Sequence, residues 1–293
     1  MTAGELPGTL KNVDTGYWRR HWRQQKLARF TIPGCEIPQK FWDNSKNVND
    51  VYQKTRRAES WRRKAEVQIA EMDIRPGARV LDIGAGTGTL AFPLAARGCH
   101  VTAIEPSELM REGLAAYQND EGMPEITIIP RRWEDVNIGE FDEPFDRVIA
   151  SYSLTMVDIG YALERMQECC RGSVHLFWFL TPPSWTRVGQ VLWPQLHGTA
   201  FHDEPLADCL WQVLFEMGIY AHMTVEPAKK PTVYPSIDLA VEEYYQRLNC
   251  STEEQSKIIR DYFRQHMKKT SGGYYSEGDL RGAHIWWNVN GRS

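Results

Sequence analysis

An apolar run that leads directly into three alternating glycines constrains the fold of this chain more than any other feature. Residues 80–83 read Val-Leu-Asp-Ile, and Gly84, Gly86 and Gly88 follow at once. Glycine allows tight backbone turns and lets a ligand approach the backbone closely. A helix that starts after such a turn directs free N–H groups at that ligand. The segment therefore predicts a strand, a ligand-binding turn and a helix.

Strands and helices continue to alternate along the chain. We expect strands at 79–83, 100–105, 126–129, 145–151, 173–180, 219–225 and 284–289, and helices at 89–97, 107–117, 159–169 and 206–217. This alternation is typical of an α/β protein, in which a mostly parallel sheet carries helices on both faces.

Two regions lie outside the regular alternation. Residues 1–72 form a predicted N-terminal helical cap, with a helix at 17–30 and a helical apolar pattern from 42 to 72. The α/β domain spans 73–293 and carries insertions at 181–205 and 228–282, which are long enough to be functional or packed as a lid. The second insertion predicts helices at 237–248 and from a capping box, Ser251-x-x-Glu254, to 268. These helices could cover the site or form a homodimer face.

Composition excludes several classes of protein. The 293 residues are 42% hydrophobic, and no apolar run approaches the ~20 residues that span a bilayer, so we expect no membrane partner. A net charge of −4 disfavours a dedicated nucleic-acid binder. The first residues lack the apolar segment of a secretory signal, so the expected address is cytoplasmic. The cysteines form no C-x-x-C pair, and His197 and His202 are spaced poorly for a shared ion, so we predict no metal site.

Details of the glycine turn indicate which ligand it holds. The spacing is G-x-G-x-G, whereas the dinucleotide motif G-x-G-x-x-G needs glycine where Thr89 stands. Asp82, two residues before the first glycine, would repel a pyrophosphate and suits a cationic ligand. Glu105 closes the next strand 17 residues after Gly88, where an acid can accept hydrogen bonds from ribose hydroxyls.

The run VLDIGAGTGTLAFPLAARGCHVTAIEPS resembles the first two sequence blocks of class I S-adenosylmethionine-dependent methyltransferases. The likeness covers roughly residues 74–180, and the overall pattern is similar to the small-molecule enzymes of ubiquinone and menaquinone biosynthesis. The resemblance implies a Rossmann-like, seven-stranded, mostly parallel sheet with helices on both faces, an N-terminal helical cap and helical insertions. It also implies S-adenosylmethionine as the cofactor.

By the same resemblance, cofactor-binding roles carry over to this chain. The three glycines would wrap the methionine part of the cofactor, Asp82 would lie near its amino group and Glu105 would hold the ribose. Met110 would pack on the adenine, and Trp133 suits core packing as well as cofactor contact. The 42–72 helix would cover the cofactor, with Trp42 or Tyr52 in its pocket. The full set that we expect is Asp82, Gly84, Ala85, Gly86, Gly88, Glu105, Pro106, Met110, Arg132, Trp133, Glu134 and Ser151.

The acceptor side is defined less sharply by the sequence. Ligands bind beyond the carboxyl ends of the strands in open α/β sheets, which places the segment 181–205 at the acceptor. By the resemblance, Tyr152 would lie just below the reactive methyl. We expect it to be catalytic together with His202, a base beside Asp203, with His197 as the alternative base. Core packing suits Tyr152 equally well, and a surface position suits His202. Aromatic side chains nearby would favour an amine acceptor or the sulfonium itself.

The predicted function is methyl transfer from S-adenosylmethionine to a small molecule by in-line displacement. Two alternatives stay open. The basic, aromatic segment 17–29 could dock RNA or a protein substrate, although such runs are more often solvated helix faces. The other alternative is a non-catalytic module that binds the cofactor.

Overall fold

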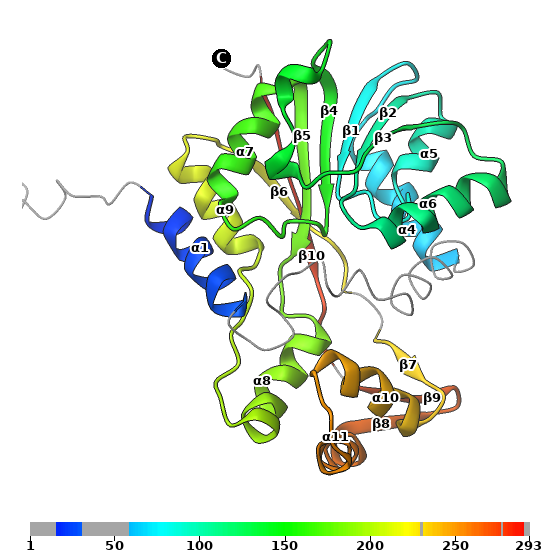
Figure 1. The fold of residues 1–293 in the computed structure, drawn as a ribbon, viewed down its shortest axis with the longest axis vertical. Coiled ribbons are helices and arrows are strands. Elements are labelled where there is room, and N and C mark those ends of the chain that lie inside the picture. The colour runs from blue at the N-terminus through cyan, green and yellow to red at the C-terminus, as the bar shows by residue number, and fades with distance from the viewer. Residues whose placement is uncertain (1–15, 31–58, 229–230, 277, 290–293) are drawn as a thin grey trace, which may run out of the picture.

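A seven-stranded sheet forms the centre of the part of the chain that the structure, a computed structural model, describes: residues 16–30, 59–228, 231–276 and 278–289 (Figure 1). The strand order is β3-β2-β1-β4-β5-β10-β6, and β10 alone runs antiparallel to its neighbours. The strands are β1 (Arg79–Ile83), β2 (His100–Ile104), β3 (Thr127–Ile129), β4 (Phe145–Ser151), β5 (Cys170–Phe179), β6 (His222–Val225) and β10 (Gly282–Asn288). The predicted Rossmann-like, mostly parallel sheet is confirmed.

Helices cover both faces of this sheet (Figure 1). Because successive side chains of a strand point to opposite faces, Val80 packs with one helical layer and Leu81 with the other. The first layer includes α4 (Glu59–Glu71) and α5 (Ala91–Ala96), and α6 (Glu108–Glu121) lies on the same side; the second contains α1 (Tyr17–Phe30), α7 (Ile159–Glu168) and α9 (Ala207–Glu216). Two short 3₁₀ turns, η2 (Trp133–Asp135) and η3 (Ile138–Glu140), connect β3 to β4.

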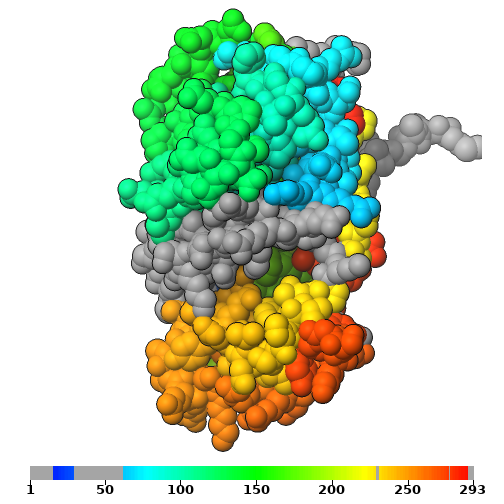
Figure 2. Space-filling model, turned by 90° about the vertical axis from the view of Figure 1, so that its right-hand side faces the viewer, coloured from blue at the N-terminus to red at the C-terminus, as the bar shows by residue number. Residues whose placement is uncertain are grey.

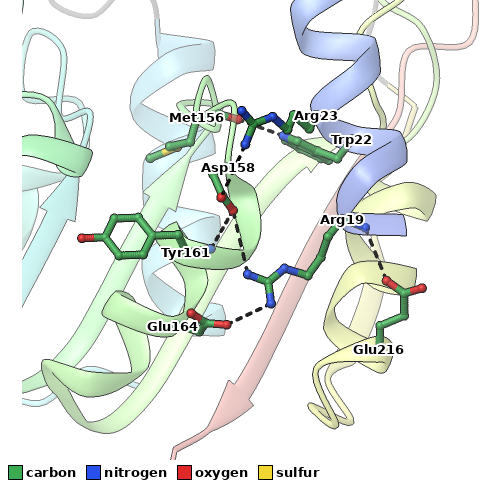
Figure 3. Close-up of polar contacts among 8 residues, drawn as sticks. All are labelled: Arg19, Trp22, Arg23, Met156, Asp158, Tyr161, Glu164 and Glu216. Atoms are coloured by element: carbon green, nitrogen blue, oxygen red, sulfur yellow. Dashed lines mark hydrogen bonds and ion pairs between the residues drawn. The ribbon is translucent and has the colours of Figure 1, made fainter. Parts of the chain in front are cut away.

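The N-terminal helix α1 is fastened to α7 and α9 by its own charged side chains (Figure 3). Trp22 is fully buried, and its indole N–H donates to the Met156 carbonyl at 2.9 Å. Arg19 pairs with Glu164, while the Glu216 carboxylate accepts hydrogen bonds from the first turn of α1. An acid at a helix N-terminus is favoured by the helix dipole. The basic face of α1 is therefore used within the molecule.

A smaller lobe lies beyond the carboxyl edge of the sheet (Figure 1). This carboxyl-edge lobe contains α8 (Ser184–His197), β7 (Val233–Tyr234), α10 (Ile237–Arg247), α11 (Glu253–His266), β8 (Met267–Thr270) and β9 (Gly273–Ser276). Its three helices share an apolar core, and its strands form a separate antiparallel sheet in the order β7-β9-β8. The two expected insertions thus build one unit, although they are separate in sequence.

Several local predictions need correction. The capping box of α11 is Thr252-x-x-Gln255, one residue later than predicted, because the Thr252 hydroxyl accepts from the Gln255 amide. The expected strand 219–225 begins only at His222, whereas the insertion 181–205 contains helix α8, as expected of a helical insertion. Of the 42–72 pattern, the structure describes α4 alone, and Trp42 and Tyr52 lie outside the described residues. None of the described helices is both long and apolar enough to cross a membrane.

Candidate functional site

The glycine turn after β1 needs glycine for two separate reasons. Gly84 has a φ of +73°, and a Cβ at this position would overlap the Ser153 side chain. Gly88 has a φ of +85°, and a Cβ there would lie 2.5 Å from the Phe92 ring. Side chains are therefore excluded both by the backbone conformation and by close packing.

Gly86 differs from the other two glycines. Its φ is +56°, but among the described residues a Cβ would meet no atom closer than the Met110 sulfur at 4.0 Å. The described residues therefore leave space beside the backbone at the centre of the turn, on the side where Met110 lies. A ligand can approach the peptide backbone closely at such a position.

Glu105 joins the ends of β1 and β2. One carboxylate oxygen accepts the Gly86 N–H at 2.8 Å, and the other accepts the Ser107 N–H at 2.9 Å. Ser107 in turn caps α6 by accepting the Met110 N–H. The carboxylate is 6% exposed, so its charge lies in a shielded place beside the glycine turn.

Asp82 is a buried carboxylate that a positively charged ligand would stabilise. It is 2% exposed, and no hydrogen bond from any described residue reaches its side chain. Burial, with a further contribution from the negative charge of Glu105, raises the pKa of Asp82 to about 7. A bound cation would remove the electrostatic penalty of the ionised form. The ammonium and sulfonium of S-adenosylmethionine meet this need, so the residues fit the cofactor that the sequence predicts.

The other predicted cofactor residues divide into two groups. The first group lies around the glycine turn. Ala85 is part of this turn, Pro106 follows β2, Met110 is on α6, and Ser151 ends β4. The turn Arg132–Trp133–Glu134 follows β3, but the Trp133 indole is in the core and donates to the Ala162 carbonyl at 3.0 Å. Arg132 is exposed and pairs with Asp135. The structure therefore corrects the expectation of cofactor contact by the Trp133 ring, because that ring is already packed against α7.

Tyr152 follows β4 in a strained conformation at the carboxyl edge. Its φ of +55° is rare for a bulky residue. The phenol donates a short hydrogen bond of 2.6 Å to Glu226, and the Lys64 ammonium lies 3.8 Å from the ring centroid. Burial first, and then the Glu226 charge, raise the pKa of Tyr152 well above its usual value. The phenol is therefore held as a hydrogen-bond donor rather than as a base.

The structure does not bring the predicted histidines to Tyr152. His202 is exposed on the segment between α8 and α9, and no hydrogen bond joins it to Tyr152 within the described part of the chain. His197 packs on Trp193, and its ring shares a hydrogen bond with the Leu248 carbonyl. The role of His202 as a base stays a prediction that no contact supports.

Sequence reasoning missed Glu226, Gln68 and a buried histidine pair. His175 on β5 and His284 on β10 are hydrogen-bonded at 2.9 Å through His175 Nδ1 and His284 Nε2. The other ring nitrogen of His284, Nδ1, lies 3.1 Å from a Glu71 oxygen. Burial lowers the pKa of His284 to about 4, so the ring is neutral near pH 7. This contact ties α4 to the sheet. The position of Glu226, directly after a predicted strand, was a usable signal, because that is where ligands bind in open α/β sheets.

Known proteins resemble this chain in sequence and in fold. Residues 80–172 match the family model of a methyltransferase domain. An uncharacterized protein of Haemophilus influenzae is 26% identical over 233 residues, which cover 76% of this chain and 80% of that protein. A candidate methyltransferase from Bacillus halodurans has a similar fold, with a TM-score of 0.52 and 16% identity over 77% of this chain and 98% of the other. Another candidate methyltransferase, from an antibiotic biosynthesis pathway of Anabaena variabilis, has a TM-score of 0.51 and 19% identity. That match covers 76% of this chain and 96% of the other.

The matched domain, the strand order and the glycine turn with its two acids together define the class. Residues 80–172 form a methyltransferase domain within a sheet of the class I fold, and the chain is an S-adenosylmethionine-dependent methyltransferase.

Replacing Asp82 by Asn tests whether burial of the ionised carboxylate destabilises the folded protein. In the folded, ligand-free protein its pKa is about 7, against an ordinary 3.8. The native state thus keeps a proton that the unfolded chain releases, so stability falls as pH rises from about 4 to 7. At pH 8 we expect Asp82→Asn to raise the free energy of unfolding, by at most about 4 kcal/mol. At pH 4 the gain should largely vanish. Urea unfolding at both pH values measures the difference, and equal effects would contradict the assignment.

Replacing Gly86 by Ala separates backbone strain from ligand contact. Gly122, at the end of α6, offers a matched control, because its φ is +60° and a Cβ there also meets no close atom. Both variants should lose about 1–2 kcal/mol of stability through the left-handed conformation. Only Gly86→Ala should weaken binding of S-adenosylhomocysteine, by about tenfold or more, in a calorimetric titration. Equal affinities of the two variants would show that Gly86 does not face the cofactor.

Proposed function

We propose that this methyltransferase acts on a small molecule that binds between the sheet and the carboxyl-edge lobe. The observation that carries the proposal is the polar cluster at the carboxyl edge, where Tyr152, Glu226 and Gln68 meet beside the cofactor-binding turn. Ligands of open α/β sheets bind at this edge.

The shape of the molecule supports a small acceptor. Figure 2 shows a hollow directly above the carboxyl-edge lobe, with green and dark red atoms at its floor. Strand β10 begins at Gly282, next to Tyr152 and Glu226.

The charges of α1 argue against RNA or protein docking through this helix. Lys26 is 2% exposed and forms an ion pair with Glu204 at 2.9 Å. Arg19 and Arg23 face the Asp158 carboxylate, as Figure 3 shows. Cations that are already neutralised add little to the attraction of a phosphate backbone. We therefore keep the macromolecular substrate as the alternative.

The residues of this chain would share the work of methyl transfer. Bound S-adenosylmethionine supplies a methyl on a sulfonium, which is a good leaving group. Asp82 provides a counter-charge for the cationic cofactor, and Glu105 holds the glycine turn in its binding conformation. Tyr152 stands at the end of β4 as a hydrogen-bond donor. Holding the acceptor in line can supply about 7–11 kcal/mol, which makes positioning the main contribution of the protein.

A labelling experiment tests the proposed function. The protein is incubated with S-adenosylmethionine that carries a radioactive methyl, together with the low-molecular-weight fraction of a bacterial extract, total RNA or extracted protein. We expect label in the low-molecular-weight fraction only, and clearly less with the Gly86→Ala variant when S-adenosylmethionine is limiting. Label in RNA or protein alone would overturn the small-molecule proposal and favour the alternative.

A further inference from the structure

Four segments that are distant in sequence meet around Glu226. The Tyr152 phenol donates to one Glu226 oxygen at 2.6 Å, and the Gln68 amide donates to the other at 3.4 Å. Gly282 completes the arrangement, since a Cβ on this residue would overlap both the phenol and the carboxylate. Gln68 is 3% exposed, so its amide is fixed in place. The carboxylate is thus held by directed hydrogen bonds at the carboxyl edge.

Aromatic faces lie beside this carboxylate. The Phe179 ring packs on Tyr152 at 4.8 Å between centroids, and Trp185 meets Phe179 edge-on at 5.6 Å. Aromatic faces attract cations, and a carboxylate next to them adds a full negative charge. Together these groups form a site with the chemistry of an ammonium receptor.

Two observations indicate that the site favours positive charge. The Lys64 ammonium lies 3.8 Å from the centroid of the Tyr152 ring, where it marks the position that a cation adopts. The pKa of Glu71 is raised by burial and by the negative charge of Glu226. The same charge opposes the burial effect at His284.

We propose that Glu226 binds and deprotonates the methyl acceptor, and that this acceptor is an amine. This inference rests on the proposed function and names the chemistry of its substrate. The ammonium of the acceptor donates to Glu226 beside these aromatic rings. A proton passes from nitrogen to the carboxylate, and the freed lone pair forms the new N–C bond. The S–C bond breaks with its electron pair on sulfur, which yields S-adenosylhomocysteine, and Glu226 then releases the proton to solvent.

Tyr152 and Gln68 would be positioning residues in this scheme. Their hydrogen bonds orient the carboxylate, and the Tyr152 ring holds the Lys64 ammonium on its face. Removal of the phenol hydroxyl leaves that face in place. Tyr152→Phe should therefore reduce amine binding less than loss of the Glu226 charge does.

A binding experiment on the full chain, saturated with S-adenosylhomocysteine, tests the proposal. Amines and alcohols of the same shape are titrated in pairs, namely benzylamine with benzyl alcohol, phenethylamine with 2-phenylethanol, and butylamine with butanol. At least one amine should bind about tenfold tighter than its alcohol. Glu226→Gln should abolish this preference, whereas Glu254→Gln, at an exposed position on α11, should retain it.

The outcomes separate this inference from the proposed function. Unchanged binding of S-adenosylhomocysteine by Glu226→Gln shows that the variant is folded and that the cofactor site is intact. If that binding persists but no amine is preferred over its alcohol, or the preference survives in Glu226→Gln, the amine proposal is overturned and the small-molecule proposal stands. Label found only in RNA or protein would overturn the small-molecule proposal instead.

Discussion

The hydrogen bonds that the Glu105 carboxylate accepts from Gly86 and Ser107 hold the cofactor side of this protein together. They join the turn after β1 to the start of α6, and so bring three glycines, Asp82 and Met110 into one place. A hydrogen bond to a charged, shielded acceptor is stronger than one between neutral groups, so these two bonds hold the turn in its conformation. Asp82 is left with a raised pKa, which a cationic ligand would bring down. Glu105 thus holds the turn in its conformation, and Asp82 favours a positively charged ligand.

The acceptor side depends on a different set of contacts. Strand β10 runs antiparallel between β5 and β6, so its first residue, Gly282, lies at the edge where the parallel strands end. This brings Glu226 and Tyr152 together. The histidine pair and Glu71 then fix α4 across the sheet, and α4 carries Gln68 and Lys64 to the same edge. The carboxyl-edge lobe closes the space beyond them.

Sequence reasoning predicted the sheet well, because its strands and helices depend on local patterns. The bounds of β1 and β4 agree with the predicted strands, and the glycine turn follows directly from its residues. It failed where partners are distant in sequence. The role of Glu226 is apparent only from its hydrogen bond with Tyr152, which is 74 residues away in the sequence. The two-residue strand β7 likewise forms by pairing with β9. The Trp133 ring could suit either the core or the cofactor, and only the packing of α7 decides between them.

The most direct test of this account is a calorimetric titration of S-adenosylhomocysteine into the wild-type protein and the Glu105→Ala variant, with NADH as a ligand control. The account predicts that the wild type binds S-adenosylhomocysteine and not NADH. Loss of the Glu105 carboxylate should weaken the affinity by at least about tenfold, since charge-assisted hydrogen bonds contribute roughly 1.5–3 kcal/mol. Equal affinities of the wild type and the variant would contradict the central role given to Glu105. Binding of NADH would contradict the reading of the glycine turn.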